Sequence, residues 1–369
     1  MKRMYRLKVL AWIGLTALCS VVVLLLLAVC IPTFKFPDVD GQLYTIRHQE
    51  FRDNNPLFTD LFLNNLKKNN GYLIMGTSES DYYPNGNYSD FLNADTALKC
   101  RFSVCAGAGK SASCYFPLFL SNDNVEGLKI IYYINPAYWC NKLARNGHPY
   151  FHRYTSITAY RKANQSNDEL VNNILKANLK NISFTDRLSD WTEYYIDKAR
   201  RKYYQDLAFA LDTKKFYRRL SWVPDKMSPV HYPYYGTIDS ANYNFRYNVA
   251  GDFDINTFSF TVDTLSHFRD DELKAMIDVC KTRHIDLTFI IGPYNQIAFA
   301  NAHPSELPRM ANVCNNIKGI LEREGVPYID ATDLSSMPGT FNDWQHHSSY
   351  GAYLIYLKLK DYVLEKENH

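Results

Sequence analysis

An almost unbroken apolar run from Ala11 to Ile31 constrains this chain more than any other feature. It is long enough to cross a bilayer as a helix, which satisfies its backbone hydrogen bonds within the segment itself. Basic residues precede the run: Lys2, Arg3, Arg6 and Lys8. By the positive-inside rule they stay in the cytoplasm, and the chain after Pro32 is exported. A cleaved signal peptide is the alternative, but the run is long for one and no clear Ala-x-Ala site follows it. We therefore predict a single-pass cell-membrane anchor with an extracytoplasmic domain.

Composition and charge narrow the class of the exported part. The chain of 369 residues is 46% hydrophobic and 21% charged, which is typical of a globular protein with a sizeable core. Its formal net charge of +3 is too small to indicate a nucleic acid partner. The chain also has 29 tyrosines, whose apolar body and polar tip suit membrane interfaces and sugar-binding surfaces, although aromatic cores account for many of them.

The eight cysteines do not indicate a metal site. Two of them, Cys19 and Cys30, lie in or at the end of the apolar run, and no Cys-x-x-Cys pair occurs. We expect no metal and no cofactor. Export permits disulfides, and Cys100, Cys105 and Cys114 are close enough for a local bridge, but buried free thiols fit equally well.

Strands and helices alternate in both halves of the exported part. A connector and first helix are expected over 32–70, followed by a polar loop over 82–93. Short apolar runs predict strands over 72–75, 101–105, 128–134, 285–291 and 326–330. Helical patterns separate or follow them over 112–120, 264–283, 306–324 and 351–367. This alternation is the signature of βαβ units, so we predict an α/β fold of three layers, with a parallel sheet flanked by helices.

The segment 140–263 interrupts this rhythm and is predicted to be an insertion in the domain 71–369. Its predicted elements are helices over 168–178 and 185–220 and a loop over 224–247. The longer helix carries basic runs at 198–204 and 214–219. Such runs are usually solvated helix faces. A docking surface for anionic lipid or polymer is the alternative.

A candidate nucleophile, Ser78, directly follows the first predicted strand in Gly76-Thr77-Ser78-Glu79-Ser80. Ligands of open α/β sheets bind at the carboxyl ends of strands, although the same residues also fit ordinary turn and N-cap chemistry. An activated serine needs a base within hydrogen-bond reach and a carboxylate to orient that base. Asp343 and His346 lie together in the loop after the last predicted strand. We predict that these three residues form a catalytic triad.

At this point the chain resembles the SGNH (GDSL-like) hydrolase superfamily and, within it, the DltD family of D-alanyl-lipoteichoic acid biosynthesis proteins. Gly76-Thr77-Ser78-Glu79 resembles that family's Gly-Ser-Ser-Glu, and Ile134-Asn135-Pro136-Ala137-Tyr138-Trp139 resembles its Ile-Ser-Pro-Gln-Trp-Phe. Ile290-Ile291-Gly292-Pro293-Tyr294-Asn295 resembles its Pro-Val-Asn strand end. Asp343-x-x-His346, with Gly351 five residues further on, resembles its Asp-x-x-His motif and favours His346 over its neighbour His347 as the base. The motifs occur in order over nearly the whole chain, with the middle region poorly matched.

The superfamily's Gly-x-Asn-Asp block, whose asparagine helps to bind the oxyanion, is absent, and Asn135 is in roughly its place. We expect the oxyanion donors to be the backbone N–H groups of Ser78 and Gly107, with Gly109 in reserve. Substrate-binding roles are predicted for Glu79 and Asn295; a carboxylate in the first turn of a helix is the other interpretation of Glu79.

The resemblance implies acyl transfer outside the membrane, together with a membrane-bound O-acyltransferase and a cell-surface glycopolymer as partners. A serine acyltransferase or esterase would then place a D-alanyl or acetyl group on a polymer hydroxyl. Lipoteichoic acid and an exopolysaccharide are both possible acceptors. Two alternatives stay open: a free-standing secreted carbohydrate esterase, and a non-catalytic glycan-binding assembly protein on the same fold.

Overall fold

A computed structural model describes residues 2–32, 43, 56–81, 87–107, 109–140, 168–180, 182–189, 192, 201–211, 262–302, 304–341 and 345–368. The chain divides into two compact units. One comprises Met1–Pro37 and Trp191–Leu220, and the other comprises Asp38–Asp190 and Ser221–His369.

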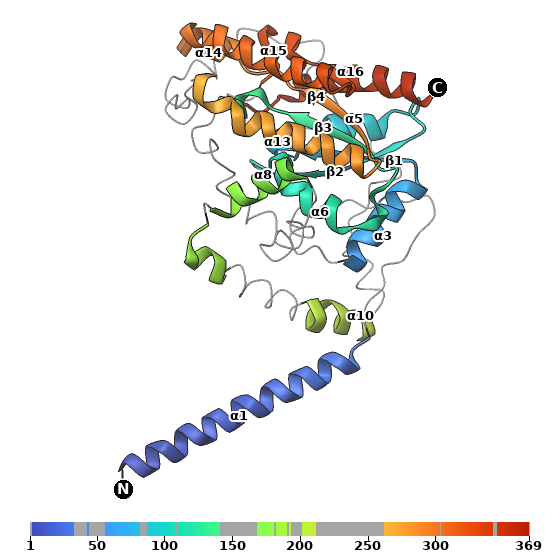
Figure 1. Cartoon of the computed structure of the whole chain (residues 1–369). Helices are drawn as coiled ribbons and strands as arrows, with labels where there is room; N and C mark the ends of the chain where they lie inside the picture. The colour runs from blue at the N-terminus through green and yellow to red at the C-terminus, as the bar shows by residue number, and fades with distance from the viewer. Residues whose placement is uncertain are drawn as a thin grey trace. The chain divides into compact units, whose positions relative to one another are not determined.

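The first unit is dominated by helix α1, Lys2–Cys30 (Figure 1). Within it, the segment Tyr5–Leu27 has a mean hydropathy of 2.6, and none of it is buried against the rest of the protein. By length and composition this segment can cross a membrane. The predicted N-terminal helix is therefore confirmed, and the side of the membrane on which the rest of the chain lies stays a prediction. The unit also contains two short helical segments, η6 (Arg201–Asp206) and α10 (Leu207–Leu211). The Tyr203 hydroxyl donates a hydrogen bond to the carbonyl oxygen of Leu24 in α1.

The second unit is built on a parallel sheet, which confirms the predicted α/β class (Figure 1). Among the described residues its strands are β1 (Gly71–Gly76), β2 (Arg101–Ala106), β3 (Lys129–Ile134), β4 (Asp286–Ile291) and β5 (Tyr328–Asp330). Their order is β2-β1-β3-β4-β5, and every neighbouring pair is parallel. The central strands are apolar at nearly every position because helices cover both of their faces.

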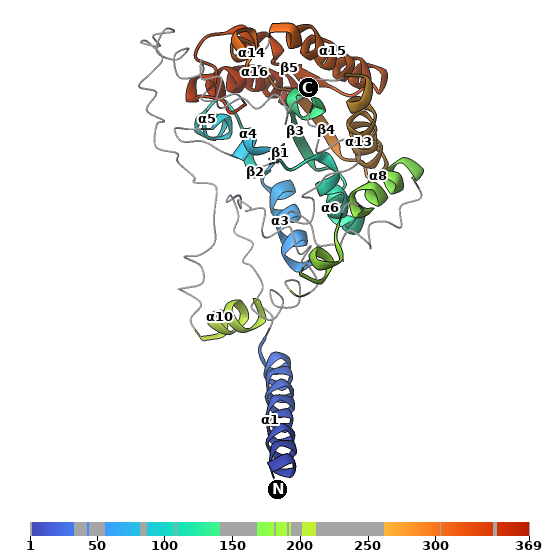
Figure 2. The same ribbon diagram turned by 90° about the vertical axis from the view of Figure 1, so that its left-hand side faces the viewer.

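Helices flank the sheet on both sides, which gives the three predicted layers. They are α3 (Pro56–Lys68), α5 (Tyr88–Ala94), α6 (Phe116–Ser121), α8 (Glu169–Lys180), α13 (Val262–Thr282), α14 (Gln296–Ala302), α15 (Leu307–Arg323) and α16 (Ser349–Glu367). Short 3-10 helices include η1 (Ala112–Tyr115) and η3 (Pro136–Cys140). Helices α5 and α13 lie on opposite sides of β1 and β3 (Figure 2). On the α5 side, Tyr72, Ile74 and Ile131 share a core with Phe91 and with Leu359 of α16.

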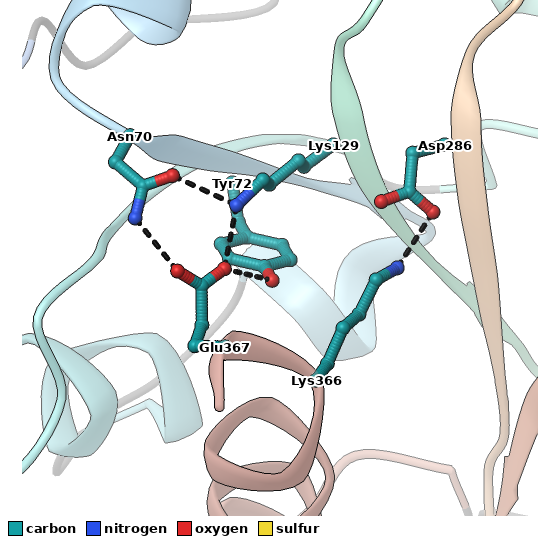
Figure 3. Close-up of polar contacts among 6 residues, drawn as sticks. All are labelled: Asn70, Tyr72, Lys129, Asp286, Lys366 and Glu367. Carbon is teal, nitrogen blue, oxygen red and sulfur yellow. Dashed lines mark hydrogen bonds and ion pairs between the residues drawn. The ribbon is translucent and has the colours of Figure 1, made fainter. Parts of the chain in front are cut away.

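The last helix is fixed at its carboxyl end to the amino ends of the central strands (Figure 3). The carboxylate of Glu367 accepts hydrogen bonds from Asn70, Tyr72 and Lys129. Burial raises the pKa of the Glu367 carboxyl, but these bonds, led by that from Lys129, outweigh burial and lower the pKa to about 2. Lys366 also pairs with Asp286 at the start of β4. Because α16 begins a few residues after His346, this attachment helps to set the position of the loop that carries His346.

The predicted strands and the long helices outside the middle region occur within a few residues of their expected bounds. Of the helix expected over 185–220, the structure describes 185–189, 192 and 201–211, so its full length stays a prediction. The loop predicted over 82–93 is wrong for residues 88–93, which belong to α5. Asn87 caps this helix in a capping box with Asp90, and burial of Phe91 and Leu92 stabilises it. Helix α14 was not predicted. In the middle region α8 confirms the helix expected over 168–178, whereas 214–219 and 224–247 lie outside the described residues.

For the cysteines of the second unit, the expectation of buried thiols is confirmed over that of a local disulfide. The described thiols outside α1 are free and buried: Cys100, Cys105, Cys114, Cys280 and Cys314. Burial raises the pKa of the Cys100 and Cys114 thiols to about 12. These side chains therefore serve as small apolar core residues.

Candidate active site

Ser78 lies at the carboxyl edge of the sheet, immediately after β1, as the first residue of the short helix α4 (Ser78–Asp81). Its side chain is 6% exposed. Gly76 ends the strand at φ +148°, a conformation that an L side chain rarely adopts. The Tyr115 hydroxyl accepts from the Gly76 N–H at 3.1 Å and lies 3.0 Å from the Gly76 carbonyl oxygen and 2.6 Å from that of Cys105. This tyrosine therefore fixes the ends of β1 and β2 together just before the serine.

The residues after Ser78 are fixed as well. The Tyr88 hydroxyl donates to Ser80 Oγ at 2.7 Å, and Asn87 Nδ2 donates to the Ser80 carbonyl oxygen at 2.7 Å. Both donors belong to the cap and first turn of α5, the helix that the sequence did not predict. The position of Ser78 is thus determined from both sides by buried side chains.

Glu79 joins the loop after β1 to the loop after β3. It is completely buried and accepts hydrogen bonds from Thr77 Oγ1 and from Asn135 Nδ2. The Asn135 Oδ1 accepts from the Ala137 N–H at 2.8 Å. Glu79 is also in the first turn of α4, as the second interpretation of this residue expects. The substrate-binding role of Glu79 and the oxyanion role of Asn135 stay predictions. The Asn135 amide donates one hydrogen bond to Glu79.

His346 faces Ser78 from the opposite end of the chain. Its Nε2 lies 2.9 Å from Ser78 Oγ, a hydrogen-bond distance. The neighbouring His347 is buried instead, and its Nε2 lies 2.8 Å from the Tyr133 hydroxyl. His347 also forms an antiparallel β-bridge with Phe341, which closes the loop between these two residues. His347 therefore anchors the loop, and His346 presents its ring to the serine. Asp343, the predicted orienting carboxylate, lies outside the described residues.

A third side chain, Gln345, belongs to the same cluster and was missed by the sequence reasoning. Its Nε2 lies 3.2 Å from Ser78 Oγ and 3.2 Å from His346 Nε2. Nothing in the sequence marks this residue except its place inside the Asp-x-x-His motif.

The remaining predicted residues occupy the same edge of the sheet. Gly107 directly follows β2 and is buried, and its carbonyl oxygen accepts from the Lys110 N–H at 2.9 Å. Gly109 has a left-handed φ of +69°. Asn295 follows β4, and its Oδ1 caps α14 by accepting from the Ala298 N–H at 3.0 Å. The oxyanion roles of the two glycines and the substrate-binding role of Asn295 remain predictions.

A small cavity of about 30 Å³ lies beside Thr77 and Asn135 and reaches Arg269 and Glu272 of α13. The two α13 side chains are buried and form an ion pair. Glu272 also accepts from Ser111 Oγ at 2.6 Å. Burial raises the pKa of the Glu272 carboxyl, but its pairing with Arg269 and its hydrogen bonds outweigh burial and lower the pKa. The pair therefore stays ionised behind the loop that carries Ser78.

Together these contacts define a serine hydroxyl with a histidine base, a pair that can deprotonate the serine for attack on a carbonyl carbon. No family model matches the chain, and no curated protein does. Among solved structures the chain is similar to an extracellular lipase from Streptomyces rimosus, at 13% identity over 78% of this chain and 97% of the lipase, with a TM-score of 0.33. At that TM-score the likeness adds no argument about this site, and the assignment depends on the geometry above.

Proposed function

We propose that this chain is a membrane-anchored serine acyltransferase or esterase that acts outside the cytoplasmic membrane. The observation that carries the proposal is the 2.9 Å contact between His346 Nε2 and Ser78 Oγ at the carboxyl edge of a parallel sheet. The buried contacts that fix the loops on both sides of Ser78 support it, because a nucleophile must be held in position.

In this proposal Ser78 Oγ attacks the carbonyl carbon of an acyl donor while His346 Nε2 takes up the hydroxyl proton. The tetrahedral intermediate collapses, the bond to the leaving oxygen breaks, and His346 returns the proton to that oxygen. The acyl group is then an ester of Ser78. A second hydroxyl attacks this ester with His346 again as the base, and Ser78 recovers its proton when the product leaves. Asp343 is the proposed orienting carboxylate for the His346 ring.

The second hydroxyl decides between transfer and hydrolysis. We propose that it belongs to a cell-envelope glycopolymer, so that the reaction is O-acylation, with D-alanyl or acetyl as the acyl group and a membrane-bound O-acyltransferase as the source. The sequence resemblance to the DltD family supports this assignment, as does helix α1, which would keep the enzyme close to a membrane partner. With water as the acceptor, the same site is an esterase.

Two serines of one loop provide the test. We expect Ser78→Ala to abolish both hydrolysis of p-nitrophenyl acetate by the purified chain and polymer acylation in cells. Ser80→Ala is the matched control: it removes a buried hydroxyl that contacts Tyr88, so it should lower stability but leave residual activity well above that of Ser78→Ala. Full polymer acylation by the Ser78→Ala chain would contradict the catalytic proposal and favour a non-catalytic assembly role.

A further inference from the structure

Three polar atoms form a triangle at the candidate nucleophile. Ser78 Oγ lies 2.9 Å from His346 Nε2, and Gln345 Nε2 lies 3.2 Å from each of them. Gln345 is only partly buried, as is His346. An amide group at this place therefore contacts the reacting oxygen itself.

The orientation of the amide follows from the protonation that a base requires. A neutral His346 that accepts from the Ser78 hydroxyl has a lone pair on Nε2. The NH₂ end of Gln345 can donate to Ser78 Oγ, whereas the carbonyl end would place an oxygen lone pair beside the lone pair of His346 Nε2. The nitrogen end therefore faces the serine in the resting site.

We propose that the Gln345 side-chain amide donates a hydrogen bond to the oxyanion of the tetrahedral intermediate, an inference that rests on the acyl-transfer function proposed above. The oxyanion and Ser78 Oγ are bonded to the same carbon in that intermediate. A donor in contact with Oγ then needs only a small side-chain rotation to reach the oxyanion. Asn135, which is in roughly the place of the superfamily's oxyanion asparagine, donates to Glu79.

The triangle also makes this hydrogen bond specific to the transition state. When His346 takes up the serine proton, its Nε2 carries a hydrogen that repels the amide N–H of Gln345. Rotation of the amide away from His346 and toward the substrate oxygen is then favoured at the moment when negative charge develops on that oxygen. An interaction that strengthens only at this stage lowers the barrier rather than tightening substrate binding.

Gln345→Ala in the full-length chain tests the proposal. Removal of one oxyanion donor lowers kcat by roughly 100- to 1,000-fold in serine hydrolases. We expect a fall of this order in kcat for p-nitrophenyl acetate, with KM changed by less than about threefold. The acidic limb of the pH profile should stay in place because His346 remains. Gln345→Asn keeps the amide on a shorter stem and should recover part of the rate.

Phenylboronic acid gives a second readout that needs no turnover. It forms a tetrahedral adduct with an activated serine and places a charged oxygen where the oxyanion would lie. We expect Gln345→Ala to weaken its binding to a similar extent as kcat falls. Wild-type kcat and unchanged boronate affinity in Gln345→Ala would overturn the inference and leave the proposed function intact. A wild-type chain that neither turns over the ester nor binds the boronate would overturn both.

Discussion

Substitution of Gly351, the third residue of α16, is the most informative test of the packing behind the site. A Cβ on this glycine would overlap the carbonyl oxygen of Thr340 and lie 2.9 Å from its carbonyl carbon. That carbonyl cannot turn away freely, because it accepts from the Ser348 N–H at 2.8 Å at the start of the helix. The clash is therefore with fixed backbone.

Two terms of opposite sign set the size of the effect. Replacement of a helical glycine by alanine stabilises by about 0.5–1 kcal/mol through backbone entropy. Overpacking of a fixed site costs about 1–3 kcal/mol or more. We therefore expect Gly351→Ala to lower the free energy of unfolding by about 1–2 kcal/mol.

Gly319 in α15 is the matched control. The nearest atom to a Cβ there is the terminal Nη1 of Arg323 at 3.2 Å, which is the mobile end of a flexible side chain. Gly319→Ala should therefore stabilise the protein by about 0.5–1 kcal/mol. Urea unfolding of the detergent-solubilised chain, followed by tryptophan fluorescence, measures both variants.

Gly351→Ala should also alter the candidate active site. Thr340 lies beside Phe341, whose bridge to His347 closes the loop that carries His346. A displaced Thr340 should move this loop, so we expect Gly351→Ala to slow labelling of Ser78 by a fluorophosphonate, and Gly319→Ala to leave the rate unchanged. A Gly351→Ala chain that is as stable and as reactive as the wild type would refute the reasoning.

Three further predictions concern buried or paired charges, and thermal or urea unfolding measures each. Glu272→Gln should cost about 3–5 kcal/mol, because it leaves the buried Arg269 without its carboxylate partner. Asn135→Asp places a second carboxylate against the buried Glu79 and should cost about 2–4 kcal/mol at pH 7, with a smaller loss at low pH, where protonation relieves the repulsion. The pKa of Glu367 is lowered from 4.5 to about 2 in the folded chain, so its contribution to the free energy of unfolding is complete above pH 4.5 and is lost as the pH falls toward 2. After allowance for its partial exposure we expect this contribution to be about 1 kcal/mol. Glu367→Gln should abolish this part of the pH dependence.

Periodicity and strand length were enough to predict the sheet. Strands such as Lys129–Ile134 are buried on both faces, so they appear in the sequence as continuous apolar runs. Helix α5 was missed because it is short and its composition resembles a loop. Its stability comes from the Asn87 and Asp90 capping box and from Phe91 in the core, and the second of these depends on contacts distant in sequence.

Site residues could be predicted only where the residue type and its spacing in the sequence are enough to indicate the chemistry. Ser78 and His346 met that condition through a strand end and a motif. The partners of Glu79 and His347 could not be predicted, because the contacts with Asn135 and Tyr133 form only when distant strand ends meet at one edge of the sheet. Gln345 was missed for the same reason: its contact with Ser78 depends on how the folded loop turns its side chain.

The central claim is that His346 activates Ser78. Its most direct test is the reaction of the purified chain with a fluorophosphonate, followed by mass mapping of the modified peptide. The 2.9 Å contact predicts a single adduct on Ser78 in the wild type and almost none in His346→Ala, with the fold of that variant verified by circular dichroism. An adduct on another serine, or equal labelling of Ser78 without His346, would contradict the claim.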